Sequence, residues 1–179
     1  MFFLARRPRT CSGELELREA APADARGIID IANAVAREKV YNVSEVFGYS
    51  EADERSLISR VRRSKDLILV ARMDGRVVGF LTLMRYFGGR SPKVQHVGEV
   101  GINIRDGYRD RGLGYKMMNY AIDWARQKGY KKLCLSVFST NERAASLYKK
   151  CGFVEEGRRK AQFKLDDTYV DEIVMGLFL

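Results

Sequence analysis

Residue types that bind metals or form disulfides are scarce in this chain of 179 residues. Its single histidine is His96, and its three cysteines, Cys11, Cys134 and Cys151, do not have the spacing of a metal site. We therefore expect no zinc cluster, no metal cofactor, and free thiols in the reducing environment of the cytoplasm. No apolar run approaches the roughly 20 residues that span a bilayer, so a membrane partner is not expected either.

Acidic residues are fewer than basic ones. The chain has 23 aspartates and glutamates against 32 lysines and arginines, which gives a net charge of +9. Such a basic surface favours an anionic partner, which here means nucleic acid, an acidic protein or a phosphorylated cofactor. A solvated surface without any partner explains the same charge equally well, so the charge alone does not choose.

Linker sequences are absent as well, because no stretch of the chain is rich in proline, glycine or serine. A chain of this length is typical of one domain. The start, residues 1–13, combines arginines with an apolar patch that is shorter than the roughly 7–15 residues of a signal-peptide core. We predict a frayed basic leader at 1–13 and a single domain at 14–179.

Hydrophobic periodicity and turn signals predict both strands and helices. Leu15 and Leu17 alternate with polar residues as in a strand, and Ser50 with Asp53 matches the capping box of a helix start. Asp74 followed by glycine, between two β-rich runs, is typical of a hairpin turn. The predicted order is β-α-α-β-β-β-α-β-α-β-β, which indicates a mixed sheet with helices on its faces.

The stretch YRDRGLG, residues 108–114, lies between a predicted strand and a predicted helix. Glycines at such a junction let main-chain N–H groups approach a ligand, and a helix N-terminus attracts anions such as phosphate. A dinucleotide fingerprint needs a third glycine where the chain has Met117, and a Walker loop needs Gly-Lys-Ser/Thr, which is missing. The remaining pattern is Arg-x-x-Gly-x-Gly, formed by Arg109, Gly112 and Gly114. Taken alone, this pattern also fits a turn from strand to helix in which the glycines serve the backbone conformation and bind no ligand.

A second motif follows downstream. Asn141 comes after a predicted buried strand, and Tyr148 lies on a predicted helix that ends at Gly152 and Phe153. With both motifs at the right places in the element order, the chain resembles the GCN5-related N-acetyltransferase (GNAT) superfamily over roughly residues 14–179. Its carboxy-terminal pattern is similar to that of amino-acid N-acyltransferases and ribosomal-protein alanine N-acetyltransferases. The resemblance implies the GNAT fold, an α/β (α+β) domain whose mixed, mostly antiparallel sheet has about seven strands and about four flanking helices.

The resemblance also implies acetyl-coenzyme A (acetyl-CoA) as co-substrate. Its pyrophosphate would lie against main-chain N–H groups of the glycine loop, and its pantetheine arm would pair with the end of the preceding strand. The cofactor-binding residues implied in this way are Ile102, Asn103, Ile104, Arg109, Asp110, Arg111, Gly112, Leu113, Gly114 and Asn141. From the residues alone, Ile102 and Ile104 are also expected in the core, and Asn141 is also expected to cap its helix.

Two residues are implied to act in catalysis. Tyr148 corresponds to the family's tyrosine near the sulfur, which protonates the departing thiolate, although its place on an apolar helix face also fits a core residue. Glu99 is the acidic residue of the strand at 96–104 and corresponds to the glutamate that many members use as general base. An exposed strand glutamate without a role is an equal alternative, and His96 is a weaker candidate base.

Because no strong base is obvious, we expect an acceptor amine that loses its proton easily. Deprotonating a lysine-type amine at pH 7 costs about 4.6 kcal/mol, against about 1 kcal/mol for an α-amino group. The expected function is acetyl-CoA-dependent transfer of an acetyl group to the α-amino group of an amino acid, a small molecule or a protein N-terminus. The segment between the first two predicted helices is expected to line the acceptor groove, with Tyr41, Glu45, Phe47 and Tyr49 shaping it.

Other functions stay open on the sequence. They are a lysine or polyamine acetyltransferase, a non-catalytic acyl-CoA-binding module, and a basic nucleic-acid-binding domain. The sequence has no stripe of lysines and arginines interleaved with aromatic residues, which a stacking platform for nucleic acid needs, so no nucleic-acid partner is expected. A homodimer is compatible with the resemblance.

Overall fold

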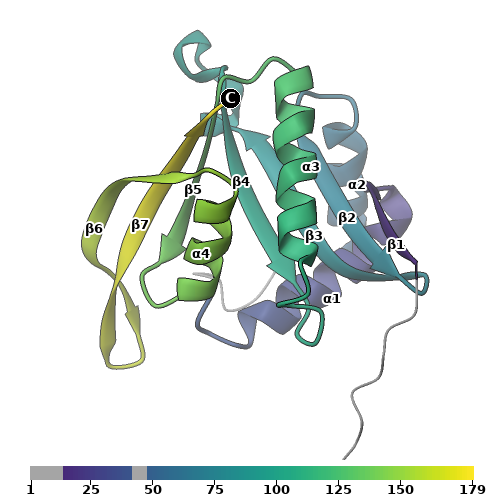
Figure 1. The fold of residues 1–179 in the computed structure, drawn as a ribbon. Coiled ribbons are helices and arrows are strands. Elements are labelled where there is room, and N and C mark those ends of the chain that lie inside the picture. The colour runs from purple at the N-terminus through teal and green to yellow at the C-terminus, as the bar shows by residue number, and fades with distance from the viewer. Residues whose placement is uncertain (1–13, 42–47) are drawn as a thin grey trace, which may run out of the picture.

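The structure is a computed structural model that describes residues 14–41 and 48–179 (Figure 1). The predicted leader at 1–13 lies outside the described residues, as do Glu45 and Phe47, two of the residues predicted to shape the acceptor groove. The predicted domain at 14–179 therefore contains one segment, 42–47, that is not described.

Within the described residues, a seven-stranded sheet forms the centre of the fold, in the order β1-β2-β3-β4-β5-β7-β6. Neighbouring strands are antiparallel except for β4 and β5, which run parallel. The strands are β1 Leu15–Glu19, β2 Leu67–Met73, β3 Arg76–Arg85, β4 Val97–Ile104, β5 Lys132–Phe138, β6 Val154–Leu165 and β7 Thr168–Phe178. The predicted mixed, mostly antiparallel sheet is confirmed.

Helices of the described residues cover both faces of this sheet (Figure 1). Helices α3 and α4 lie on one face, and α1 and α2 lie on the other. The helices are α1 Ala25–Ala36, α2 Glu51–Val61, α3 Leu113–Gln127 and α4 Glu142–Lys150. The described residues also form short 3-10 turns at Pro22–Asp24, directly before α1, and at Tyr86–Gly89 and Pro92–Val94. Among the helices of the described residues, none is long and apolar enough to cross a membrane.

Each face of the sheet has its own hydrophobic core. On one face, α3 contributes Met117 and Met118, both fully buried. On the other face, α1 and α2 contribute Ile28 and Ile58, which pack with Phe80 of β3. Successive side chains of a strand point to opposite faces, so the position of a residue along β4 decides which core it reaches.

Local sequence signals account for several element boundaries. The predicted capping box of α2 is confirmed, because Ser50 Oγ accepts the N–H of Asp53 at 3.2 Å and the Asp53 carboxylate accepts the N–H of Ser50 at 3.2 Å. The predicted hairpin turn between β2 and β3 is also confirmed. Asp74 and Gly75 have φ values of 51° and 74°, the left-handed geometry that a tight hairpin needs.

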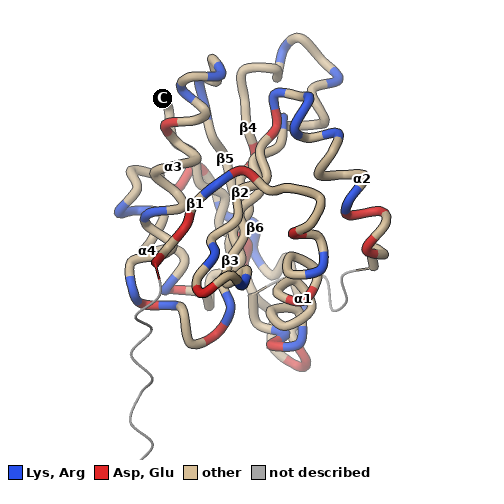
Figure 2. Tube along the Cα trace, turned by 90° about the vertical axis from the view of Figure 1, so that its right-hand side faces the viewer, with Lys and Arg blue, Asp and Glu red and all other residues tan. Residues whose placement is uncertain are grey.

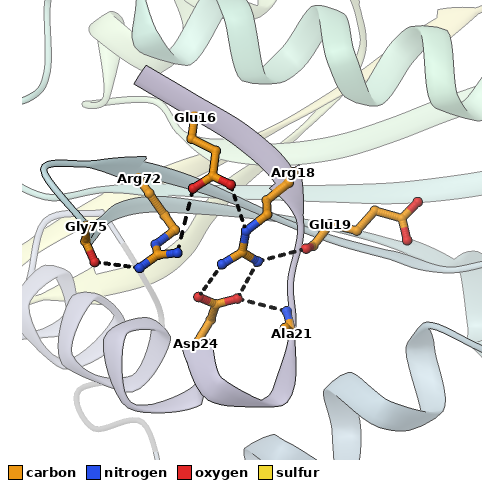
Figure 3. Close-up of polar contacts among 7 residues, drawn as sticks. All are labelled: Glu16, Arg18, Glu19, Ala21, Asp24, Arg72 and Gly75. Carbon is orange, nitrogen blue, oxygen red and sulfur yellow. Dashed lines mark hydrogen bonds and ion pairs between the residues drawn. The ribbon is translucent and has the colours of Figure 1, made fainter. Parts of the chain in front are cut away.

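A buried carboxylate fixes the start of α1 (Figure 3). Asp24 is 5% exposed. It accepts hydrogen bonds from the two terminal nitrogens of Arg18, at 2.7 and 3.0 Å, and from the N–H of Ala21 at 2.8 Å. Burial acts to raise the pKa of the Asp24 carboxyl, but these hydrogen bonds outweigh burial and hold the pKa below its ordinary value. Arg18 also pairs with Glu16, so this cluster ties β1 to the helix that follows it.

The feature of the fold that positions the site is a split between β4 and β5. The two strands are paired only where Val97–Glu99 face Lys132–Cys134. Beyond Glu99, β4 stays paired with β3, and beyond Cys134, β5 stays paired with β7. Figure 1 shows the two strands diverging away from the end of the molecule that holds the C-terminus. The middle of the sheet is therefore open on one side of Glu99.

Candidate active site

A cavity of about 760 Å³ opens where β4 and β5 separate. Its lining comes from residues 100–104 of β4, from Ser136 and Val137 of β5, from the loop before α3, and from α4. Tyr41, just after α1, also lines it. Ligand sites typically have volumes of about 300–1,000 Å³, so this cavity is large enough for a small molecule.

Most of the predicted cofactor-binding residues meet at this cavity. Those that line it are Ile102, Asn103, Ile104, Arg109, Asp110, Gly112, Gly114 and Asn141. The other two do not line it. Arg111 is exposed in the loop between β4 and α3. Leu113 is 5% exposed, because its side chain packs into the hydrophobic core between α3 and the sheet.

One wall of the cavity is the open edge of β4. Ile102 pairs with Leu81 of β3 on its other side, but from Val100 onward β4 has no pairing with β5. Such an edge can hold an extended ligand through main-chain hydrogen bonds, as an added strand would be held. The side chains of Ile102 and Ile104 are half-buried and pack against the α3 core. These residues are therefore part of the core and part of the cavity wall at once.

The glycine loop delivers the first turn of α3 to the cavity. Gly112 is the N-cap residue with a left-handed φ of 76°, which favours glycine. Gly114 is needed for packing, since a Cβ there would lie 2.9 Å from Leu147 Cδ2 of α4. The first helical hydrogen bond runs from the N–H of Lys116 to the carbonyl of Gly112 at 3.1 Å. No side chain of the described residues caps α3, and its first turn has no acid, so the N–H groups at its start suit an anion.

The guanidinium group of Arg109 is engaged within the protein. It donates from Nη1 to Glu38 Oε2 at 2.7 Å and from Nη2 to the other carboxylate oxygen, and its Nε donates to the carbonyl of Ile104 at 2.8 Å. Its side chain is 12% exposed, and the hydrogen bond to Glu38 raises the pKa of Arg109. This arginine joins the glycine loop to the end of α1, so any contact it makes with a phosphate involves its main chain.

Tyr41 lies between two guanidinium groups at the rim of the cavity. Arg109 and Arg143 stack on its ring at 5.1 and 5.5 Å from the centroid. Arg143 also donates to the Tyr41 hydroxyl at 3.0 Å and pairs with Asp110 at 3.2 Å. Glu38 and Arg143 were not predicted as site residues, because their partners are 71 and 102 positions away and no local pattern reveals such pairs.

Tyr148 of α4 reaches the cavity with a buried ring. The residue is 7% exposed, and its ring lies 6.2 Å from that of Phe153. Burial, with a smaller contribution from Cys151, raises the pKa of Tyr148 to about 12. Its hydroxyl has no hydrogen-bond partner among the described residues, and the residue lines the cavity. Tyr148 is therefore a neutral hydroxyl whose donor is available to a ligand.

Asn141 precedes α4 and caps it. Its side-chain oxygen accepts the N–H of Ala144 at 3.2 Å, which confirms the capping interpretation. Because Asn141 also lines the cavity, the cap leaves its side-chain NH₂ group as a donor that can face a ligand.

Glu99 lies at the apex of the split, on the other face of the sheet. It is the last residue of β4 that pairs with β5, where it lies opposite Cys134, and it is exposed. Its neighbour Val100 points into the core under α3, so Glu99 points toward the face that carries α1 and α2. Glu99 does not line the cavity. His96 is exposed before the start of β4 and lies farther from the split than Glu99.

The described cysteines are free and poorly nucleophilic. Burial, together with the charge of Glu99, raises the pKa of Cys134 to about 11. Burial also raises the pKa of Cys151. Both thiols stay protonated at neutral pH, and the thiol form is not the nucleophile. Cys11 is outside the described residues.

Curated relatives of the chain are acetyltransferases. It is 34% identical to the L-amino acid N-acetyltransferase AaaT of Escherichia coli over 112 residues, 60% of this chain and 65% of that protein. This chain therefore spans just under two thirds of that relative's length. It is 32% identical to the ribosomal protein bS18 alanine N-acetyltransferase of Escherichia coli over 76 residues, 42% of this chain and 51% of that protein.

Solved structures share the fold over nearly the whole chain. An acetyltransferase of the GNAT family from Streptococcus pneumoniae has a TM-score of 0.86 and 27% identity, with 93% of this chain and 99% of that chain covered. A putative acetyltransferase from Salmonella typhimurium, solved with its cofactor acetyl-CoA, has a TM-score of 0.84 and 19% identity, with 93% and 94% covered. The second similarity concerns the fold alone.

A family model covers the elements that build the cavity. The model described as "Acetyltransferase (GNAT) family" matches residues 33–153, which is more than half of the chain. The matched range includes the split strands, the glycine loop and Tyr148. The chain therefore belongs to the GNAT acetyltransferase family.

Proposed function

We propose that this protein transfers the acetyl group of acetyl-CoA to a primary amine, preferably the α-amino group of an amino acid or of a protein N-terminus. The observation that carries the proposal is the cavity between β4 and β5, where an open strand edge meets an uncapped helix start. An extended, phosphorylated thioester needs both features, because its amide-rich arm pairs with a strand and its phosphates pair with N–H donors.

The residues around the cavity fit acetyl-CoA. Main-chain N–H groups at Leu113 and Gly114 lie at the start of α3, where no side chain caps the helix, and would hold the pyrophosphate. The edge of β4 at 102–104 would hold the pantetheine arm, with Asn141 as an additional donor. A Cβ at Gly112 would meet no protein atom within 4 Å, so the space in front of this glycine is open to a ligand.

Acetyl transfer forms a bond from the amine nitrogen to the carbonyl carbon and breaks the bond from that carbon to sulfur. Charge appears first on the carbonyl oxygen and then on the leaving thiolate, so donors aimed at these atoms lower the barrier. The N–H groups on the open edge of β4 are candidates for the oxygen. The neutral hydroxyl of Tyr148 is the candidate for the sulfur.

Tyr148 acts more effectively as a hydrogen-bond donor than as a full acid. Its pKa of about 12 lies above the roughly 8.5 of a free thiol, so complete transfer of its proton to the thiolate is uphill by about 5 kcal/mol. A hydrogen bond to a charged partner is worth about 1.5–3 kcal/mol without any transfer. The thiolate then takes its final proton from the acetylated nitrogen or from water.

Among the described residues, no free carboxylate lines the cavity, which supports an α-amino acceptor. Among the described residues that line it, Asp110 is the single carboxylate, and Arg143 already pairs with it at 3.2 Å. Glu99 at the split would be the base if one acts, since it faces the side opposite α3 and α4, from which an acceptor can reach the apex. An α-amino group, with a pKa near 7.8, needs little help at neutral pH.

Direct transfer to the amine is favoured over a covalent acetyl-enzyme. An intermediate on cysteine would need a thiolate, and the pKa of each described cysteine is raised. The kinetics are therefore expected to require both substrates on the enzyme together, without a burst of free coenzyme A when the amine is omitted.

A thiol-release assay tests the proposed function. The protein is mixed with acetyl-CoA and one amine at a time. The amines are free amino acids, peptides with a free N-terminus, polyamines, and a peptide whose N-terminus is blocked by acetylation and whose one free amine is a lysine side chain. We expect release of coenzyme A with the α-amines first. Release of coenzyme A only with polyamines or with the lysine peptide would identify a polyamine or lysine acetyltransferase. Binding of acetyl-CoA without release of coenzyme A for any amine would identify a non-catalytic acyl-CoA-binding module.

A further inference from the structure

Three turns meet at the end of the sheet opposite the cavity. They are residues 62–66 before β2, residues 86–96 between β3 and β4, and residues 128–131 before β5. The Tyr130 hydroxyl donates to the carbonyl of Lys65 at 2.5 Å, and the N–H of Lys131 donates to the carbonyl of His96 at 2.9 Å. These contacts hold the three turns together as one surface, which we call the basic end.

The basic end has exposed cations that pair with no acidic residue of the part of the chain that the structure describes. Its one acid, Asp66, is half-buried and already pairs with Arg85 at 3.2 Å. Seven cations of these turns are exposed and form no ion pair with the described residues: Arg62, Arg63, Lys65, Arg90, Lys93, Lys128 and Lys131. Blue residues prevail over red ones at the upper end of Figure 2, where β4 begins. Like charges at this density repel one another, and a polyanion would relieve that repulsion.

Exposed aromatic rings stand among these cations. Tyr86 and Phe87 are 38% and 73% exposed, with ring centroids 6.0 Å apart. Phe87 has a left-handed φ of 56°, a conformation unfavourable for a residue with a Cβ, although the ring contributes to neither core. Phe178, at the end of β7, is 74% exposed and lies 5.3 Å from the Nζ of Lys132. The strand order places β4 and β5 between these two sets of rings.

We propose that the basic end binds single-stranded nucleic acid, with phosphates on its cations and bases stacked on Tyr86 and Phe87. Base stacking on aromatic rings together with a basic track is how sequence-tolerant single-strand binding works. An anionic membrane is the less favoured partner, because the rings are separated by two strands rather than gathered into one apolar face. The sequence shows no such stripe because its members come from turns far apart in the chain.

This surface is separate from the cavity. The basic end lies at the start of β4, whereas the cavity begins at Val100, beyond the split. Nucleic-acid binding therefore does not depend on the proposed acetyl transfer, and each can fail without the other.

The test uses the full chain and a fluorescein-labelled 20-nucleotide oligouridylate, measured by fluorescence anisotropy. If about four cations contact phosphates, raising the salt from 50 to 200 mM should weaken binding about 50-fold. Phe87→Ala should weaken binding about 5- to 150-fold through lost stacking. The double variant Arg62→Glu/Arg63→Glu should weaken it at least about tenfold.

A matched control carries the same change of charge elsewhere. Arg26 and Arg76 lie near the turn between β2 and β3, at the end of these two strands that is far from the basic end. The double variant Arg26→Glu/Arg76→Glu should change the affinity for the oligonucleotide less than about threefold. The Tm of the Arg62→Glu/Arg63→Glu variant, measured by calorimetry, should stay within a few degrees of that of the unchanged protein, and this measurement shows that the variant is folded.

Three results would overturn the proposal. They are no binding at 50 mM salt, an equal loss of affinity in the control variant, and tighter, Phe87-dependent binding to phosphatidylserine vesicles than to the oligonucleotide. The last result would identify the basic end as a membrane surface.

Discussion

The hydroxyl of Tyr148 is neutral across the physiological range, because burial raises its pKa to about 12. Tyr148→Phe removes this donor and keeps the ring that packs beside Phe153. We expect kcat to fall about 10- to 150-fold, the loss of a hydrogen bond to a charged thiolate, with the Kd for acetyl-CoA and the Tm unchanged. Steady-state kinetics and calorimetry measure these values, and full turnover in the variant would reduce Tyr148 to a packing residue.

The pH dependence of turnover should follow the acceptor and not Tyr148. We expect the rate to rise as the amine loses its proton, up to about pH 8 for an α-amino group, and to stay level to about pH 10. The same shape is expected for Tyr148→Phe. A decline below pH 10 that disappears in this variant would mean that Tyr148 titrates far below the pKa its burial indicates.

Gly112 is the N-cap residue of α3, at the place where we propose that the pyrophosphate binds. Gly112→Val places a branched side chain at a left-handed φ of 76° in front of the helix, although no protein atom lies within 4 Å of its Cβ. We expect acetyl-CoA binding to be lost while stability falls by only about 1–2 kcal/mol. Gly107→Val is the control, since Gly107 has a φ of 82° and equally open surroundings but does not line the cavity. Equal affinities in both variants would contradict the phosphate site.

Asp24 gives stability a pH dependence of predictable sign. Its pKa is lowered in the folded protein, so its contribution is present above the ordinary carboxyl pKa and is lost as the pH falls through the folded value. Urea unfolding should show that Asp24→Asn costs about 1–3 kcal/mol at pH 7 and progressively less below about pH 4. A cost that is constant from pH 7 to pH 3 would mean that the charge of Asp24 does not matter.

At the scale of elements, an ion pair ties the glycine loop to the end of α1. Arg109 and Glu38 form a bidentate ion pair, and their side chains are 12% and 29% exposed. The side chains of the comparison pair on α2, Glu51 and Arg55, are 40% and 50% exposed. Glu38→Gln should therefore cost about 1–3 kcal/mol in urea unfolding and raise the KM for acetyl-CoA, because the loop loses its anchor. Glu51→Gln should cost less than about 0.5 kcal/mol. Equal costs would show that the contact does not position the loop.

Elements with local signals were predictable from the sequence. The capping box at Ser50, the turn at Asp74 and the glycine at the start of α3 each depend on neighbours within a few residues, and all are confirmed. The number of residues over which β4 and β5 pair was not predictable from the sequence. It depends on the pairing of β4 with β3 and of β5 with β7, which are contacts between distant parts of the chain. The partner of Arg109 was missed for the same reason, since it lies 71 positions away.

At the scale of the whole molecule, β4 connects two surfaces of different character. One end opens into the cavity, and the other end begins at the cluster of exposed cations. The net charge of +9 is therefore partly localised, although the sequence alone allowed a uniformly solvated surface. Two of the residues predicted to shape the acceptor groove, Tyr41 and Tyr49, are described. Tyr41 lines the cavity, whereas Tyr49 is 55% exposed and does not.

The proposed preference for an α-amino acceptor rests on the composition of the whole site. No free carboxylate lines the cavity in the described residues, so we expect an amine that is already partly neutral. The direct measurement is a competition within one peptide that has a free N-terminus and an internal lysine, incubated with the protein and acetyl-CoA and read by tandem mass spectrometry. The difference of about 3.6 kcal/mol in deprotonation cost predicts that the N-terminal amine is acetylated a few hundred times faster, on the order of 400-fold. Acetylation mainly on the lysine would contradict this, and it would identify an effective base, for which Glu99 is the first residue to replace.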